Sequence, residues 1–264
     1  MARFGALGGY NMRRGFVRAL SASVVACGLL ALPVAASASV TIADNYFGGA
    51  NYYNDPGDVI GSSTFDTLSA TFERLGSSLR ITINTNFAGA PETGNSLGTG
   101  YGALFLTPGV NAWTPTGPGP GYHTDTYQAG DWAYAVTMPF NPGLGNFTGA
   151  SGLYATNTGV IGMSNVGGNY SGSNFRNNQA VEFFPGAGPV AAANWTVGAG
   201  KVTFDIHDNG LLGNDFAFSW AMTCANDVIQ GQVAVPEPAT WALMILGFGS
   251  VGTALRRRKA LAAA

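Results

Sequence analysis

Apolar and polar residues alternate through most of the middle of the chain, and this alternation predicts β-strands. In the segment SATFERLGSSLRITINTNFAG, apolar residues at positions 70 and 72, and again at 79, 81 and 83, alternate with polar neighbours on either side of a turn at Gly76–Ser78. A period of two places alternate side chains on opposite faces of a strand. The segment therefore predicts a hairpin with one buried face.

Three further segments, DWAYAVTM, KVTFDIH and FAFSWAMTC, have the same period. The apolar residues predicted to share a face in each segment are Trp132, Tyr134, Val136 and Met138; Val202, Phe204 and Ile206; and Phe216, Phe218, Trp220, Met222 and Cys224. Glycine, proline and other turn-forming residues separate these segments, and no helical period occurs between the two ends of the chain. Residues 39–234 therefore predict an all-β domain, an antiparallel β-sandwich of jelly-roll or concanavalin-like type.

The first 38 residues have the pattern of a secretory signal peptide. Its positive region contains Arg3, Arg13, Arg14 and Arg18. An apolar stretch of residues 19–35 follows, and the small residues Ala36, Ser37 and Ala38 form an A-x-A cleavage site. Residues 1–38 thus predict a helical signal peptide, with Ser39 as the first residue of the exported protein. The arginine pair leaves both the Sec and the twin-arginine route open.

The end of the chain predicts a transmembrane helix. Residues 239–255 carry no formal charge, and as a helix they would measure about 25 Å, close to the thickness of a bilayer core. The basic residues that follow are Arg256, Arg257, Arg258 and Lys259. By the positive-inside rule they would stay in the cytoplasm, leaving the β domain outside. The prolines at 236 and 238 disfavour helix just before the span.

These features together resemble a known sorting signal. Val235, Pro236, Glu237 and Pro238, the Trp241-Ala242 pair, the Gly247-Phe248-Gly249 run and the basic end resemble the PEP-CTERM signal of exopolysaccharide-producing Gram-negative bacteria. The resemblance implies that residues 235–264 are recognised by an exosortase, a membrane-embedded cysteine transpeptidase. That enzyme would remove the tail while the protein is held in the inner membrane, and pass the protein to the cell surface or extracellular matrix.

The predicted β domain carries a looser resemblance. The segments NDPGDVIG, LRITINTNFAG and GLLGNDFAFSWAMTCANDVIQG are similar to segments of other exported proteins with PEP-CTERM tails. In that group a histidine often precedes the tryptophan of the last segment, whereas Ser219 precedes Trp220 here. This resemblance implies an architecture and a destination but no activity.

Charge and cysteine content narrow the choice of partner. Without its two ends the chain keeps four basic residues against thirteen acidic ones, a net charge of −9. The four basic residues are Arg74, Arg80, Arg176 and Lys201. Such a domain repels nucleic acid and suits divalent cations or neutral glycans. Cys224 is the only cysteine left, so no disulfide forms within the domain, and its place on an apolar face indicates a packed thiol rather than a nucleophile.

Evidence for catalysis is weak in this sequence. Residues 94–98 match G-x-S-x-G, but the preceding strand and following helix of a nucleophile elbow are missing. His123 and His207 are the only histidines, and His207 is expected to form a surface pair with Asp205. Asp131 and Glu182 stand beside aromatic residues, as the two carboxylates of a glycosidase would. We expect no enzymatic activity, with a carbohydrate-active hydrolase of β-sandwich fold as the alternative.

Calcium is the one cofactor that the sequence suggests. The candidate ligands are Asp55, Asp58, Asp205, Asp208 and Asp215. Carboxylate oxygens on loops suit this cation, although aspartate is also an ordinary turn residue. A calcium-dependent, lectin-like adhesin is therefore a further alternative. The principal hypothesis is a structural or glycan-associated surface protein whose partners are the export machinery, an exosortase, the membrane before processing, and exopolysaccharide.

Overall fold

The computed structural model describes residues 39–44, 59, 62–89, 99–109, 131–138, 147–164, 179–236, 244–253 and 255–256. The predicted signal peptide lies outside these residues and stays a prediction. The described strands are β1 (Ser39–Ala43), β2 (Thr67–Leu75), β3 (Ser78–Thr85), β4 (Leu104–Pro108), β5 (Tyr134–Val136), β6 (Phe147–Ala155), β7 (Gly159–Met163), β8 (Ala180–Pro185), β9 (Ala191–Gly198), β10 (Lys201–Ile206), β11 (Asp215–Ala221) and β12 (Val228–Ala234). Two short 3₁₀ helices, η1 (Ser63–Phe65) and η3 (Thr156–Thr158), precede β2 and β7.

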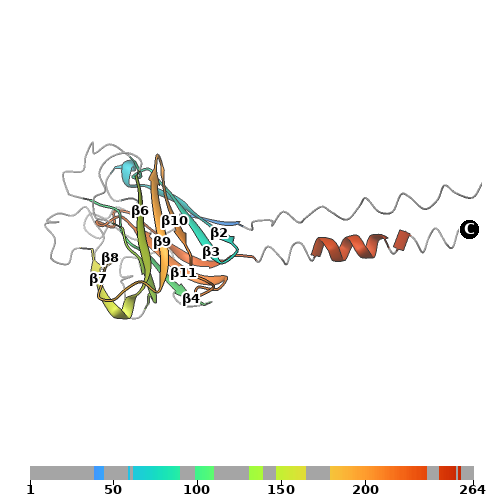
Figure 1. Ribbon diagram of the computed structural model, residues 1–264. Coiled ribbons are helices and arrows are strands. Elements are labelled where there is room, and N and C mark those ends of the chain that lie inside the picture. Colours follow the sequence, from blue (N-terminus) through green and yellow to red (C-terminus); the bar gives the residue numbers. More distant parts are fainter. Residues whose placement is uncertain are drawn as a thin grey trace, which may run out of the picture. The chain divides into compact units, whose positions relative to one another are not determined.

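Ten of these strands form one antiparallel sheet in the order β1-β2-β3-β10-β9-β6-β5-β4-β11-β12, while β7 and β8 pair as a separate ribbon (Figure 1). The predicted all-β, antiparallel class is confirmed. A two-sheet sandwich is not confirmed, because β5 bonds to both β4 and β6 and so joins the two halves of the strand order into one continuous sheet. The edge strands β1 and β12 approach each other: a Cβ at Gly231 would lie 3.9 Å from Ile42 Cδ1. The sheet is therefore nearly closed as a barrel.

The inward residues of the alternating strands form the main core. Phe72, Ile81, Phe204 and Phe218 are completely buried, as their period predicts. The rings of Phe72 and Phe218 lie edge to face with centroids 4.6 Å apart, and burial of each ring stabilises the fold by about 1.5–3 kcal/mol. The predicted hairpin is confirmed too: β2 and β3 join at Gly76, whose φ of +64° suits glycine.

The ribbon of β7 and β8 covers the outer side of β4, β5 and β11, three strands called here the covered layer. A second core cluster joins Phe105, Ala135 and Ala217 of these strands to Phe183 of the ribbon. At Gly102, just before β4, an added Cβ would overlap the carbonyl oxygen of Ala221 in β11. Only glycine therefore allows this close approach, and β11 is buried on both faces.

Two aromatic and sulfur-containing side chains lie elsewhere than predicted. Trp132 packs in the second cluster with Phe105, at a centroid distance of 6.3 Å, rather than on the inner face with Val136. The prediction was wrong because regular strand geometry in β5 begins only at Tyr134. Cys224 lies beyond the end of β11, in a small cluster at the end of the barrel. It is buried, as predicted, but does not extend the face of β11.

Near the end of the chain, residues 244–253 and 255 are helical inside the span predicted from residue 239 to 255, and Arg256, just after that span, is helical too. Within the described residues, none of the helices reaches the length and apolar character required to span a bilayer. The membrane-spanning role of the tail therefore stays a prediction.

Candidate functional site

The candidate sorting motif begins inside the folded domain. Val235, its first residue, follows β12 directly and is only 2% exposed, with its side chain in the main core. Its backbone N–H donates to the carbonyl oxygen of Asn214 at 2.9 Å. Pro236, the next residue, is exposed. The fold thus ends within the first two residues of the motif.

A buried ion pair holds the loop that carries Asn214. The carboxylate of Asp208 accepts two hydrogen bonds from the guanidinium of Arg74 in β2, at 2.6 and 3.0 Å, and both side chains are almost fully buried. Arg74 also donates to the carbonyl oxygen of Gly213, and Asp208 accepts from the N–H of Leu212 at 3.1 Å. Each charge therefore has hydrogen-bond partners, which a buried pair requires.

The first and last strands of the β domain begin and end at the same end of the barrel. Ser39, the first residue of β1, pairs with Glu73, the neighbour of Arg74. Ala234, the last residue of β12, pairs with Asp215. Because the Arg74 side chain bonds to the loop just before Asp215, the start of β1 and the end of β12 lie at the same end of the barrel. A domain linked to a membrane through both ends would have this arrangement.

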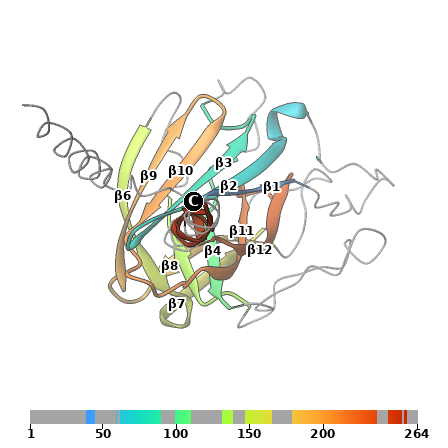
Figure 2. The ribbon, with the colours of Figure 1, turned by 90° about the vertical axis from the view of Figure 1, so that its right-hand side faces the viewer.

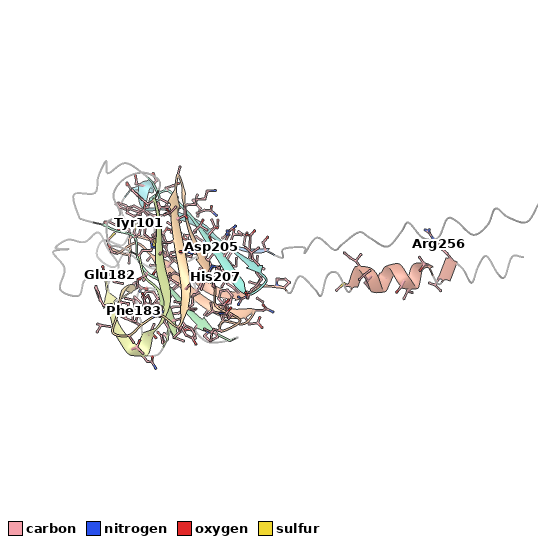
Figure 3. All side chains as sticks on the ribbon, viewed as in Figure 1. Tyr101, Glu182, Phe183, Asp205, His207 and Arg256 are labelled. Carbon is pink, nitrogen blue, oxygen red and sulfur yellow. The ribbon has the colours of Figure 1, made fainter. Side chains whose placement is uncertain are left out.

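The C-terminal helix exposes its apolar side chains. Those exposed are Met244, Ile245, Leu246, Phe248, Val251 and Leu255. Arg256, the first residue of the predicted membrane-stop cluster, lies at the end of this helix (Figure 3). The rest of that cluster, Arg257, Arg258 and Lys259, lies outside the described residues, as do Ala36, Ser37, Ala38, Glu237 and Pro238. An apolar surface of this kind requires a covering, such as lipid.

Three calcium candidates lie in the described part of the chain, and two of them bind arginine. Asp208 bonds to Arg74, and Asp205 accepts from Arg80 Nε at 2.7 Å. This hydrogen bond and the charge of Asp205 raise the pKa of Arg80. Asp215 is exposed at the start of β11. In the described segments, no group of three or more His, Cys, Asp or Glu residues could hold a metal ion. Asp55 and Asp58 lie outside these segments, and calcium binding stays a prediction.

Glu182, one of the two hydrolase candidates, lies on the ribbon. It pairs with Gly162 on the face opposite Phe183, which points to the core (Figure 3). Burial raises the pKa of Glu182, and no other cause contributes. The neighbouring ring of Phe184 is 55% exposed. Asp131 precedes β5 in the main sheet, where its carbonyl oxygen accepts from Thr107, so the two acids come from different sheets.

The remaining nucleophile and base candidates have structural partners. The Cys224 thiol accepts a hydrogen bond from Thr99 Oγ1 at 3.1 Å and donates to Asn226 Oδ1, and burial raises its pKa. A buried thiol of raised pKa is a poor nucleophile. His207 Nδ1 lies 2.9 Å from Ser78 Oγ rather than pairing with Asp205, which bonds to Arg80 instead. Ser96 and His123 lie outside the described residues.

Two buried charged residues were not predicted from the sequence. Arg74 continues the inner face of Ala70 and Phe72 by the same period of two, and this parity was the signal that its side chain points inward. Asp227 is fully buried, and its two oxygens accept from the N–H groups of Thr67 and Val228, at 2.6 and 2.8 Å. It thereby ties the start of β2 to the start of β12. Asp227 follows Asn226 just before an apolar strand segment, a place typical of a turn aspartate, and the sequence does not identify its partner.

The structure defines a class: an antiparallel β domain joined to an apolar C-terminal helix. Residues 234–259 match the family model of the PEP-CTERM protein-sorting motif, as the resemblance implied. The chain therefore carries this motif, which implies export, surface association and processing by an exosortase. No match was found among curated proteins or among solved structures.

Proposed function

We propose that this protein is exported, held briefly in the inner membrane by its tail, and released to the cell surface or matrix when an exosortase cuts that tail. The observation that carries the proposal is the PEP-CTERM match at residues 234–259. It begins at Ala234, where β12 ends. The sorting segment and the fold therefore meet at the end of β12, and removal of the residues after Val235 leaves every described strand in place.

The tail supports a membrane tether through its chemistry. The described part of its helix carries apolar side chains that no other described residue covers. In a bilayer these side chains would be buried in hydrocarbon, and Arg256 with the three basic residues after it would stay on the cytoplasmic side. The tail is short for a permanent anchor, which suits a tether that is cut.

The buried state of Val235 restricts where the cut falls. Removing this side chain from the core would cost about 1.5 kcal/mol or more, and its backbone hydrogen bond would be lost as well. The proposed cut therefore lies after Val235, so that the released product keeps this residue. Exposed Pro236 is the first position at which an enzyme could hold the chain without opening the fold.

Cells with and without the exosortase test this proposal. We expect a membrane-bound full-length form without the enzyme and a shorter surface form with it, whose last residue lies beyond Val235 by mass spectrometry. Replacing Pro236, Glu237 and Pro238 with alanine is expected to block trimming, whereas Ala234→Ser, at an exposed neighbouring position, is the matched control. A surface form that still contains residues 241–264 would contradict the proposal.

We propose a structural or glycan-associated role for the β domain, without catalysis. The side chains of Cys224 and His207 form hydrogen bonds with structural partners, which supports this choice. One observation favours a hydrolase as the second candidate: Glu182 is half-buried with a raised pKa beside an exposed aromatic ring, as in a glycosidase acid. Release of reducing sugar from β-glucan by the wild-type protein, abolished by Glu182→Gln, would replace the first proposal with the second.

The calcium-dependent adhesin remains a separate alternative. Its remaining candidate ligands are Asp55 and Asp58, with Asp215. If calcium binds, thermal unfolding in calcium should occur at a higher temperature than in chelator, and Asp55→Asn with Asp58→Asn should remove the difference. An equal Tm in both conditions would exclude a calcium site that stabilises the fold.

A further inference from the structure

Six neighbouring strands, β1, β2, β3, β10, β9 and β6, are called here the bare layer. Figure 2 shows them side by side. The ribbon reaches this layer at the end of β6, where Tyr154 packs on Phe183, and Thr148 near the start of β6 is exposed. Each strand of the layer has a threonine at the same level, and the register pairs every one with the next. In strand order this threonine row is Thr41, Thr71, Thr82, Thr203, Thr196 and Thr148.

The threonine row is regular and accessible. None of its members is buried. The Oγ1 atoms of Thr41 and Thr71 are 2.9 Å apart, and those of Thr82 and Thr203 are 3.4 Å apart. Since adjacent strands are about 4.8 Å apart, the row repeats a hydroxyl and a methyl group at that interval over about 24 Å. Such a row is a periodic surface that runs across the strands.

Charged residues flank the row without giving it net charge. On one side Glu73, Arg80 and Asp205 occupy successive strands, and on the other Lys201 pairs with Asn84. Within the described part of the β domain, Arg80 and Lys201 are the basic residues that are not buried, and both stand here. Among the described residues of this acidic domain, both Lys and Arg side chains that are not buried therefore lie beside the threonines.

Sheet stability explains the threonines and the place of Arg80 between Glu73 and Asp205, but not the place of Lys201. Paired threonines favour strands by about 0.2–1 kcal/mol per pair, so some would occur on any exposed face. Lys201, in contrast, pairs with Asn84 and Gly198 and so has no counter-charge directly across from it on either strand. With Lys201 the charged residues beside the row sum to zero, so the surface favours neither a polyanion nor a polycation.

The chemistry of the row selects one class of partner. The cores of protein interfaces are rich in aromatic and large apolar side chains, and the row and its flanking positions contain none. Nucleic acid requires a positive excess, and this surface is neutral. A neutral polysaccharide presents hydroxyl groups and C–H groups in repeating order, and a threonine hydroxyl both donates and accepts, while its methyl group packs on C–H.

We propose that the threonine row is the binding surface for a neutral, linear polysaccharide chain that lies across the strands of the bare layer. The inference rests on the proposed function in one respect: export brings this surface into contact with extracellular glycan. It names the part of the domain that would make the protein glycan-associated.

The test replaces hydroxyl groups in the centre of the row with methyl groups. Thr82→Val with Thr203→Val keeps the β-branched shape and the strand preference of both residues. The full chain, purified in detergent, is tested against mixed-linkage β-glucan as the neutral probe and alginate as the anionic one. We expect the double variant to lose affinity for β-glucan by at least about tenfold, with an unchanged Tm.

Two control variants separate the hydroxyl groups from other effects. Thr82→Ser with Thr203→Ser keeps the hydroxyls and is expected to retain most of the binding. Thr64→Val makes the same chemical change in η1, outside the row, and should bind as the wild type does. Binding to β-glucan should also persist at about 0.5 M salt, since no net charge is involved.

Four results would overturn the inference: no binding of β-glucan by the wild type, equal binding by the valine double variant, binding of alginate alone, or loss of binding at high salt. Processing is measured independently. If the valine variant is trimmed and reaches the surface but does not bind glucan, both proposals hold. If the tail is never trimmed while the purified protein binds glucan through the row, only the sorting proposal fails.

Discussion

The bare layer and the covered layer share one core but differ on their outer sides. Outward residues of the covered layer, such as Ala217 and Ala221, are small and fully buried under the ribbon. Those of the bare layer are threonines, asparagines and charged residues in contact with solvent. Phe105, another outward residue of the covered layer, is large but also apolar and buried. Alternation therefore predicts the inner face of both layers, whereas the polarity of the outward residues distinguishes a face that will be covered from one that stays open.

The largest expected difference in stability lies between variants of two nearby aspartates. Asp208 is buried inside the end of the barrel, and Asp205 lies on the outer face of the bare layer. Asp208 and its partner Arg74 are 0% and 6% exposed, whereas Asp205 and its partner Arg80 are 36% and 44% exposed. Asp208→Asn leaves the Arg74 charge buried without its counter-charge and is expected to lower the free energy of unfolding by about 3–5 kcal/mol. Asp205→Asn should cost less than about 1 kcal/mol. Urea unfolding measures both.

A rescue variant sharpens this contrast. Arg74→Met combined with Asp208→Leu removes both buried charges and should regain much of the stability lost in Asp208→Asn. The loss in Asp205→Asn should also shrink with added salt, because that pair is partly solvated. If Asp208→Asn and Asp205→Asn lost the same free energy of unfolding, burial of the Asp208–Arg74 pair would have no energetic consequence.

The two aspartates also show how far the sequence could be interpreted. The inner faces of the hairpin, β10 and β11 followed from a period of two. Both aspartates, however, occupied the same acidic segment and were interpreted alike as calcium candidates, because a sequence does not show which arginine each one meets. Cross-strand partners depend on register, which turn geometry and distant pairing determine. For the same reason the threonine row was not predicted, although each of its residues stood in a strand-like segment.

The ribbon was the largest part of the fold that the sequence did not predict. VEFFP and GVIGM are short apolar runs, and such runs do not distinguish a strand of the main sheet from a separate ribbon. Trp132 was assigned to the wrong cluster for a related reason, since nothing marked the outer side of β5 as a second core. The sorting motif was predictable because it depends on local residue identity and not on register.

Two alanines test the difference between the layers directly. Ala217 in β11 is buried beneath the ribbon, and Ala192 in β9 is exposed on the bare layer. Ala217→Leu adds methyl groups to a closed space beside Phe183 and is expected to destabilise the protein by about 1–3 kcal/mol. Ala192→Leu should change stability by no more than about 0.5 kcal/mol. If both variants unfold at the same urea concentration, the ribbon is not packed on β11 in solution.

The smallest expected effect concerns Glu182, which lies on the ribbon and is neither fully covered nor fully bare. Burial raises its pKa above the ordinary value of 4.5, so the folded state favours the protonated form. Its contribution to stability is then complete below about pH 4.5 and is lost as the pH rises through the raised folded-state pKa. Glu182→Gln has no charge to desolvate. It should therefore be slightly more stable than the wild type near pH 7, and the difference should disappear near pH 4.

Urea unfolding of both proteins across this pH range measures that difference, and the other carboxylates cancel because they are common to the two chains. A glutamine variant that is less stable than the wild type near pH 7 would mean that the carboxylate is stabilised in the fold by a partner. The charge would then be retained for stability. The expected result would mean that the fold accommodates the carboxylate at a cost, on the same outer face of the ribbon as the exposed ring of Phe184.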